Sequence, residues 1–473
     1  MLKDIMISQF SAFPNHVPQP FNEKPFNKAV TVLNDGHWKA VRNTLSPAFS
    51  GSKMKQLNKL SYCHGNASVC LSVRLSVRPT LVKKAAACRF FDHSFTELVK
   101  VVPHTKYLIV MVTGSRSKVI WGHESLYGSY SMDVVATTFF GMQIDSQKNP
   151  DDPFVKHAKE AFNFGIFSVK CMLIFFVPCM RKIFQLLGIK VANPAVGEFF
   201  QDVISRALEL RKTENIKRKD MLQLMIDAHK LDSTEEGENG ELVNENIDGD
   251  TSSHTHSKAA LSEDEIMANA FTFFLAGYET TNTALCMTSY LLATNKEIQE
   301  KLIQEVDKFA PRKEDVTYEL VGQMEYLDGV VREALRMYPP AAVTDRINDK
   351  KDIELNGFTI PKGFSVLVPI YAIHHDPDVW EEPEEFRPER FFKQNRANIH
   401  PVSWLPFGDG PRSCIGLRLA LMEIRFALVR MLQEFKFETC SETEIPPVLS
   451  TRSAFLSPPN GVRLQVVPRK KTE

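Results

Sequence analysis

The residues best suited to chemistry lie in a glycine-rich stretch near the carboxyl end, Phe407-Gly-Asp-Gly-Pro-Arg-Ser-Cys-Ile-Gly416. Its glycines and its proline predict a tight turn against a flat or close neighbour. Cys414 stands just before a predicted helix, where the helix dipole, backbone N–H groups and the nearby Arg412 favour a thiolate. Cys414 is therefore a candidate metal ligand. A dinucleotide-binding turn is disfavoured, because the third glycine and a βαβ setting are both missing.

A second group of polar residues falls in the middle of a predicted long helix, in Ala276-Gly-Tyr-Glu-Thr-Thr281. Glu279 and Thr280 place a carboxylate and a hydroxyl at a helix centre, where neither favours folding. Together they indicate a proton path. Gly277 costs such a helix about 1 kcal/mol relative to alanine. It therefore marks a packing contact, a local opening of the helix, or the close approach of another group.

Further charged and aromatic residues follow helical or loop spacings. Glu333 and Arg336 lie three residues apart on one helical face, and as a surface pair they would contribute little to stability. Arg390 lies in an aromatic loop, Phe386-Arg-Pro-Glu-Arg-Phe391. Trp38 and Arg42 lie four residues apart, so an indole and a guanidinium on one face could both reach an anionic ligand.

The elements expected to position these groups are mostly helical. Ser262 with Glu265 forms a capping box, and Leu261 with Ile266 a hydrophobic staple, so a helix is predicted from there to about Thr294. Residues 416–434 predict a second strong helix. Residues 231–250 carry eight acidic side chains and no lysine or arginine. We interpret 231–260 as a flexible acidic loop.

The overall composition excludes several classes of protein. Lys plus Arg and Asp plus Glu each total 57, and this zero net charge argues against a nucleic-acid binder that neutralises phosphates broadly. Eight cysteines without a C-x-x-C pair are no disulfide scaffold. No signal peptide or membrane-spanning run is visible. The apolar stretch 161–190 predicts either a buried helix pair or a surface that dips into a membrane interface.

The order of the motifs resembles that of the cytochrome P-450 superfamily of haem-thiolate monooxygenases. The order is Trp-x-x-x-Arg, Ala-Gly-x-Glu-Thr-Thr, Glu-x-x-Arg, Pro-Glu-Arg-Phe and Phe-x-x-Gly-x-Arg-x-Cys-x-Gly. Within this superfamily, the sequence most resembles the 3A-type subfamily and thromboxane synthase. The segments that carry this closer resemblance are Tyr127–Asp133, Lys219–Asp227 and Gln323–Asp328. The resemblance implies a mainly α fold with a smaller β portion (α+β), as one haem-centred domain over 1–473 whose N-terminal part is missing. Residues 61–122 do not resemble the family, and we interpret them as a non-family insert.

The resemblance implies a role for each motif. Cys414 would be the proximal thiolate ligand of the iron of haem b, and Thr280 with Glu279 would deliver protons. The residues implied in binding the cofactor are Phe407, Gly410, Arg412, Gly416, Trp38, Arg42 and Arg346. Those implied in a structural ion network behind the haem are Glu333, Arg336 and Arg390. Those implied in lining the substrate pocket are Leu275, Ala276, Ala341, Ala342 and Val343.

The implied function is the insertion of one oxygen atom into a lipophilic substrate, a steroid, a fatty acid or a xenobiotic. Electrons would come from NADPH through a flavin reductase, with cytochrome b5 as a further partner, at the endoplasmic reticulum membrane. Arg418, Arg425 and Arg430 are docking candidates, with ordinary solvated helix charges as the alternative. Two other functions stay open. The segment Leu449–Arg463 resembles thromboxane synthase and so favours an endoperoxide isomerase. The other alternative is a remnant that binds no haem and is at most an interaction protein.

Overall fold

The computed structural model describes most of the chain outside three long stretches. The described residues are 1–17, 26–50, 119–121, 126–142, 144, 146, 149, 151–162, 183–184, 194–213, 220–230, 261–450, 455–459 and 461–469. The predicted acidic loop 231–260 lies outside them, as do nearly all of 61–122 and most of 161–190. What was predicted for these segments stays a prediction.

The described residues are mainly helical with small β-sheets, which confirms the expected fold class. The α-helices are α1 (Asp35–Leu45), α4 (Leu126–Phe140), α5 (Pro153–Phe162), α8 (Pro194–Thr213), α9 (Met221–Lys230), α10 (Glu263–Thr294), α11 (Lys296–Phe309), α12 (Tyr318–Val321), α13 (Glu325–Met337), α14 (Ile370–His374) and α15 (Leu417–Glu434). The shorter helical turns are η1 (Asp4–Ser8), η2 (Phe26–Lys28), η3 (Ser46–Phe49), η5 (Lys313–Asp315), η6 (Pro388–Phe391), η7 (Arg396–Asn398) and η8 (Gly410–Arg412). Among the described helices, none is both long enough and apolar enough to cross a bilayer.

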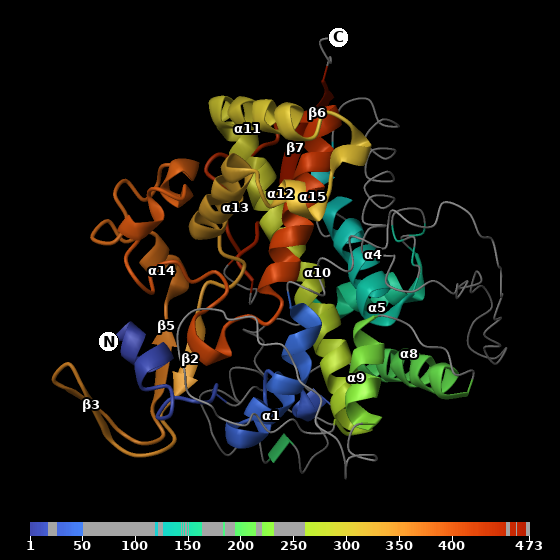
Figure 1. Ribbon diagram of the computed structural model, residues 1–473, viewed down its shortest axis with the longest axis vertical. Helices are drawn as coiled ribbons and strands as arrows, with labels where there is room; N and C mark the ends of the chain where they lie inside the picture. Colours follow the sequence, from blue (N-terminus) through green and yellow to red (C-terminus); the bar gives the residue numbers. More distant parts are fainter. Residues whose placement is uncertain are drawn as a thin grey trace.

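Helix α10 runs through the middle of the molecule (Figure 1) and packs against α4, α13 and α15. Its start confirms the predicted capping box: the Ser262 hydroxyl accepts from the Glu265 N–H, and the Glu265 carboxylate accepts from the Ser262 N–H. Gly277 is a packing contact, because an added Cβ would lie 2.8 Å from a methyl group of Val135 on α4. The helix continues through Gly277 without a break. It is therefore a rigid support for the polar residues at its centre.

The described strands form three small antiparallel sheets. One has the order β1 (Val119–Trp121), β7 (Val462–Pro468), β6 (Phe435–Thr439); the others pair β2 (Thr344–Ile347) with β5 (Ser365–Val368) and β3 (Ile353–Leu355) with β4 (Phe358–Ile360). Strand β1 comes from the end of segment 61–122, where the sequence shows no strand period. Its three residues pair with a strand at the other end of the chain. Such a distant partner leaves no local signal.

The amino-terminal segment packs on the loop that leads to Cys414. Gly410, at the start of η8, has a φ of 70°, and an added Cβ would come within 2.0 Å of the Met6 carbonyl oxygen in η1. Glycine is therefore required there both by the backbone conformation and by space. The Phe407 carbonyl accepts from the Cys414 N–H at 2.8 Å and closes the loop. Helix α15 begins directly after Gly416, as predicted.

Candidate functional site

Cys414 combines an exposed side chain with a desolvated thiol. Desolvation raises the pKa of the thiol, and it outweighs the N–H groups of Gly416 and Leu417 and the charge of Arg42, which lower it. The sulfur is therefore accessible although the surrounding protein is close enough to desolvate it. The predicted N–H groups act on the thiol, but the cation that does so is Arg42 and not the predicted Arg412, and their sum does not ionise the thiol. A metal that binds the sulfur takes the place of the proton.

The middle of α10 also opens onto accessible space, although most of this helix is buried. Ala276 is exposed, and Leu275, Glu279 and Thr280 are half-buried. Desolvation raises the pKa of Glu279 to about 7, so close to half of this carboxyl is protonated at neutral pH. The Thr280 hydroxyl donates to the Ala276 carbonyl at 2.5 Å. The two predicted proton-delivering residues and two predicted pocket residues therefore share one stretch of helix.

Phe49, in η3, connects this stretch of α10 to the Cys414 loop. A Cβ built on Gly416 would lie 3.9 Å from the Cys414 sulfur and 4.0 Å from the Phe49 ring. The Phe49 ring centroid lies 5.4 Å from that of Phe273 on α10. Phe407 is half-buried and packs against the same core. The thiol and the centre of α10 therefore belong to one region of the molecule.

The guanidinium groups of Arg42 and Arg412 lie beside the Trp38 ring, and that of Arg346 lies near Arg412; we call the three the cation cluster. The Cζ of Arg412 lies 3.9 Å, and that of Arg42 5.9 Å, from the centroid of this ring. Burial, followed by the charges of Arg346 and Arg42, lowers the pKa of Arg412 to about 9. The Nε of Arg346, a residue 1% exposed, has no hydrogen-bond partner among the described residues. Crowded positive charge with an unused donor is suited to an anion.

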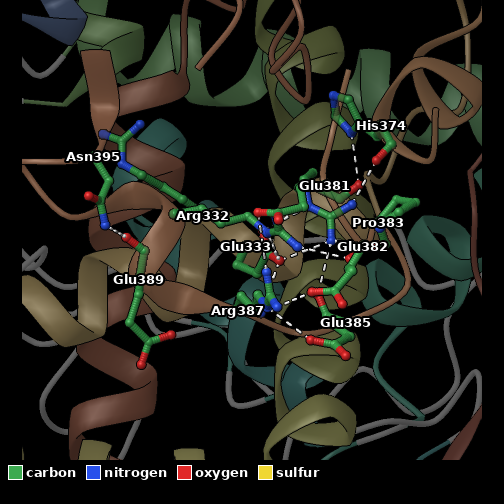
Figure 2. Close-up of polar contacts among 12 residues, drawn as sticks. Arg332, Glu333, His374, Glu381, Glu382, Pro383, Glu385, Arg387, Glu389 and Asn395 are labelled. Carbon is green, nitrogen blue, oxygen red and sulfur yellow. Dashed lines mark hydrogen bonds and ion pairs between the residues drawn. The ribbon is translucent and has the colours of Figure 1, made fainter. Parts of the chain in front are cut away.

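Glu333, Arg336 and Arg390 form the predicted ion network, whose surroundings Figure 2 shows. The Nε and Nη2 of Arg336 donate to the Glu333 carboxylate at 2.8 and 2.9 Å, and the Nε of Arg390 does so at 3.2 Å. The side chains of Glu333 and Arg336 are both 0% exposed. The spacing of these residues alone was also compatible with an exposed ion pair that contributes little to stability. The burial of both side chains excludes that alternative.

His374 extends this network and was missed by the sequence reasoning. Its Nε2 accepts from the Leu405 N–H at 2.8 Å, so its Nδ1–H donates to the Arg336 carbonyl, also at 2.8 Å. Burial lowers the pKa of His374 to about 3, which keeps the ring neutral. The ring thereby ties α13 to the start of the Cys414 loop. A single histidine at the end of a five-residue helix follows no pattern from which this role could be predicted.

Glu423 of α15 is a second residue that the sequence reasoning missed. It is 2% exposed, and the Thr281 hydroxyl lies 3.3 Å from its Oε2, while its Oε1 has no partner among the described residues. Burial raises the pKa of Glu423 to about 8, although the bond with Thr281 acts in the opposite direction. The Tyr130 hydroxyl donates to the Glu423 backbone carbonyl at 3.4 Å. Helix α15 is thus joined to α10 one residue beyond Thr280.

The raised pKa of Glu423 predicts that the protein loses stability as the pH rises. Between about pH 4.5 and 8 the unfolded chain releases this proton while the folded protein keeps it. The contribution is complete below pH 4.5 and falls by about 1.4 kcal/mol per pH unit up to pH 8. In Glu423→Gln this part of the pH dependence disappears, as urea unfolding at several pH values can show. An unchanged slope in the variant would mean that Glu423 is ionised in the folded protein.

The predicted pocket turn Ala341-Ala342-Val343 joins α13 to β2. Ala341 forms a β-bridge with Phe455, and the Ala342 carbonyl accepts from the Tyr371 N–H at 3.0 Å. Val343 is 50% exposed. The backbone of the turn is therefore fixed, while one apolar side chain faces accessible space.

Of the three arginines of α15 considered for partner docking, Arg418 is exposed. Arg430 is 2% exposed and hydrogen-bonded to Gln433, so its burial excludes it from a docking face. Arg425 is mostly buried and forms an ion pair with Asp328. The docking prediction is wrong for Arg430 and Arg425, because α15 is buried nearly all round and both side chains lie inside the protein.

The thiol, the acid and hydroxyl of α10 and the cation cluster together define a class: an oxidoreductase whose haem iron is held by a cysteine thiolate. The family model described as Cytochrome P450 matches residues 123–466. The chain belongs to the cytochrome P450 family of monooxygenases.

Comparison with curated proteins gives similar relatives of the 3A type. Cytochrome P450 3A29 of Sus scrofa is 36% identical over 475 residues, which cover 100% of this chain and 82% of the relative. Cytochrome P450 3A11 of Mus musculus is 37% identical over 471 residues, and cytochrome P450 3A2 of Rattus norvegicus is 37% identical over 472. Each of these two alignments covers 99% of this chain and 81% of the relative.

The described residues fit the haem cofactor of this family on three observations. The accessible Cys414 sulfur is available as an iron ligand. The cation cluster has the surplus charge and the unused Arg346 donor that haem carboxylates would satisfy. Gly416 beside the Cys414 sulfur and the exposed Ala276 on α10 are both small residues, which would leave room for the group.

Proposed function

We propose that this chain inserts one atom of dioxygen into a lipophilic substrate such as a steroid, a fatty acid or a xenobiotic, with Cys414 as the ligand of haem iron. The observation that carries the proposal is the Cys414 thiol, which is accessible inside the fold and faces the N–H groups of Gly416 and Leu417. When bound, the haem supplies the dioxygen chemistry, and the thiolate favours O–O cleavage.

The chain's own residues then hold the cofactor, the substrate and a proton. Within the cation cluster, Arg346 offers its free Nε to a haem carboxylate, and Trp38 supports the other two guanidiniums. Leu275, Ala276 and Val343 give the substrate an apolar surface. Glu279 is the proton donor, with the Thr280 hydroxyl next to it as the group that passes the proton on. Glu333, Arg336 and Arg390 keep the supporting loops in place.

The proposal includes partners and a location. Electrons come from NADPH through a flavin reductase, with cytochrome b5 as a second donor, at the endoplasmic reticulum membrane. Support comes from the similarity to 3A-type relatives and from Arg418, an exposed cation on the helix that follows Cys414. A peripheral membrane contact through 161–190 is part of the same proposal, although most of that segment lies outside the described residues.

The role of Glu279 predicts that turnover falls as the pH rises. A proton donor must be protonated, and the pKa of Glu279 is about 7, so the donating form is lost above that pH. We expect product formation to decline on the alkaline side of about pH 7. In Glu279→Gln we expect the turnover to be lower and this decline to disappear, which a pH–rate profile of both proteins measures. A decline that persists in Glu279→Gln would assign it to another group.

One pair of measurements tests the proposed function. The reduced carbon monoxide complex of the full chain should show the red-shifted Soret band of a thiolate-ligated haem. NADPH-dependent oxygen consumption with a reductase and a steroid should then yield an oxygenated product. The band without oxygen consumption would support the rival endoperoxide isomerase, which needs no external electrons. Absence of the band would refute both enzymes and leave the haem-less interaction protein.

A further inference from the structure

The cation cluster is assembled from three elements that are distant in sequence. Arg42 lies on α1, Arg346 on β2, and Arg412 on η8, two residues before Cys414. Mutual repulsion would separate such charges unless the surrounding structure holds them. Asp35 and Asp345 offset part of the positive charge on Arg412, but the pKa of Arg412 is still lowered. What holds the three elements together therefore decides where the guanidiniums lie.

Asn15 forms hydrogen bonds with residues of α1, β2 and η8, the three elements that carry the cation cluster. Its Oδ1 accepts from the Arg412 Nη2 at 3.1 Å and from the Asp35 N–H at the start of α1 at 2.9 Å. Its Nδ2 donates to the Asp349 carboxylate just after β2, and its backbone carbonyl accepts from the Ile347 N–H at 3.0 Å. The residue is 1% exposed.

The bonds of Asn15 use both polar atoms of its side chain. The amide oxygen accepts twice and the amide nitrogen donates once, so an aspartate lacks the donor and a leucine lacks both. Arg412 has other acceptors, the carbonyls of Pro14 and Leu33 at 2.8 Å each, and so would stay nearby without Asn15. The effect of Asn15 is therefore on orientation.

We propose that Asn15 is a positioning residue for the cofactor: it sets the mutual placement of Arg42, Arg346 and Arg412, and thereby the affinity for the haem carboxylates. This inference rests on the proposed function, since it needs a chain that binds haem. It adds a residue outside every sequence motif of the site. Asn15 contacts neither iron nor substrate in this proposal. It acts through the three guanidinium groups that it holds in place.

The test compares two forms of the cofactor. Wild type, Asn15→Leu and Asn15→Asp are reconstituted with haem or with haem dimethyl ester, in which both carboxylates are esterified and uncharged. The rate of haem loss to excess apomyoglobin is followed by absorbance. We expect both variants to release haem about tenfold faster than wild type, because a hydrogen bond to a charged group is lost or a carboxylate competes for Arg412. With the dimethyl ester, we expect the three proteins to release the cofactor at equal rates.

The controls separate this role from a general effect on folding. Asn398→Leu removes an exposed asparagine in η7 and should match wild type with both cofactors. If Asn15→Leu does not fold, Asn15→Asp decides alone, since its carboxylate keeps both acceptor bonds. Faster release of both cofactors by the same factor, or no change with either, overturns the inference. Failure of wild type to bind any haem overturns the proposed function and this inference with it.

Discussion

We expect the replacement of Cys414 with serine to abolish the red-shifted Soret band of the reduced carbon monoxide complex and to reduce oxygenation to background. The reason is the sulfur itself, since a serine hydroxyl stays protonated where the thiol gives a thiolate to the metal. Serine nearly preserves the volume of the residue. The backbone contact of this position, from its N–H to the Phe407 carbonyl, is open to any residue but proline. The variant therefore isolates the ligand atom from the fold of the loop.

The matched control is Cys440→Ser, at the end of β6. The Cys440 sulfur is half-accessible, and it contacts the Thr443 hydroxyl and the Arg463 carbonyl. We expect its spectrum and turnover to equal those of wild type. A red-shifted band retained in Cys414→Ser, or lost in Cys440→Ser, would contradict the assignment of Cys414 as the ligand.

Replacing Arg336 with methionine should lower the free energy of unfolding by about 3–5 kcal/mol, because it removes two hydrogen bonds from the buried Glu333 carboxylate and leaves Arg390 as the only cation paired with it among the described residues. The loss extends beyond one ion pair. The guanidinium also donates to the carbonyls of His374 and Pro383 at 2.7 Å each. Urea unfolding measures the effect. We expect the variant to lose haem more readily as well, since His374 ties this network to the Cys414 loop.

Two further variants make this prediction discriminating. Arg312 and Asp315 form an ion pair with the same three-residue spacing, but the Arg312 side chain is 77% exposed, so Arg312→Met should cost less than about 1 kcal/mol. In the double variant Glu333→Leu/Arg336→Met, the Glu333 charge is gone, but Arg390 loses its ion-pair partner, and three carbonyls and the Arg387 N–H also lack partners. We therefore expect little recovery. Full recovery would mean that the carbonyl bonds contribute nothing.

Local signals in the sequence predicted the parts of the fold that short segments determine alone. The capping box of Ser262 and Glu265 and the start of α15 after Gly416 follow from neighbouring residues, and the structure has both. The ordered motifs also selected the family correctly. The pairing of Trp38 with Arg42 followed from helical spacing, since a separation of four residues fixes one face of a helix.

Features that depend on distant partners could not be predicted in this way. The burial of Arg430 and Glu423 is one example: α15 alternates charged and apolar residues like a surface helix, and only its neighbours on several sides reveal that it is internal. Strand β1 needs β7, and the role of Asn15 needs α1, β2 and η8 together. A single polar residue carries no period, so its function appears only when the elements around it are placed.

The contact between Gly410 and Met6 has a consequence for how members of this lineage can diverge. The carbonyl of Met6 occupies the space that any side chain at position 410 would need. A mutation of this glycine is therefore tolerated only after the backbone near Met6 has moved away, which makes the order of substitutions matter. If only the Cys414 loop is randomised, we expect every active variant to carry glycine at position 410. Libraries that also vary the first eight residues remove only the steric obstacle, because the φ of 70° at position 410 still strains any other residue.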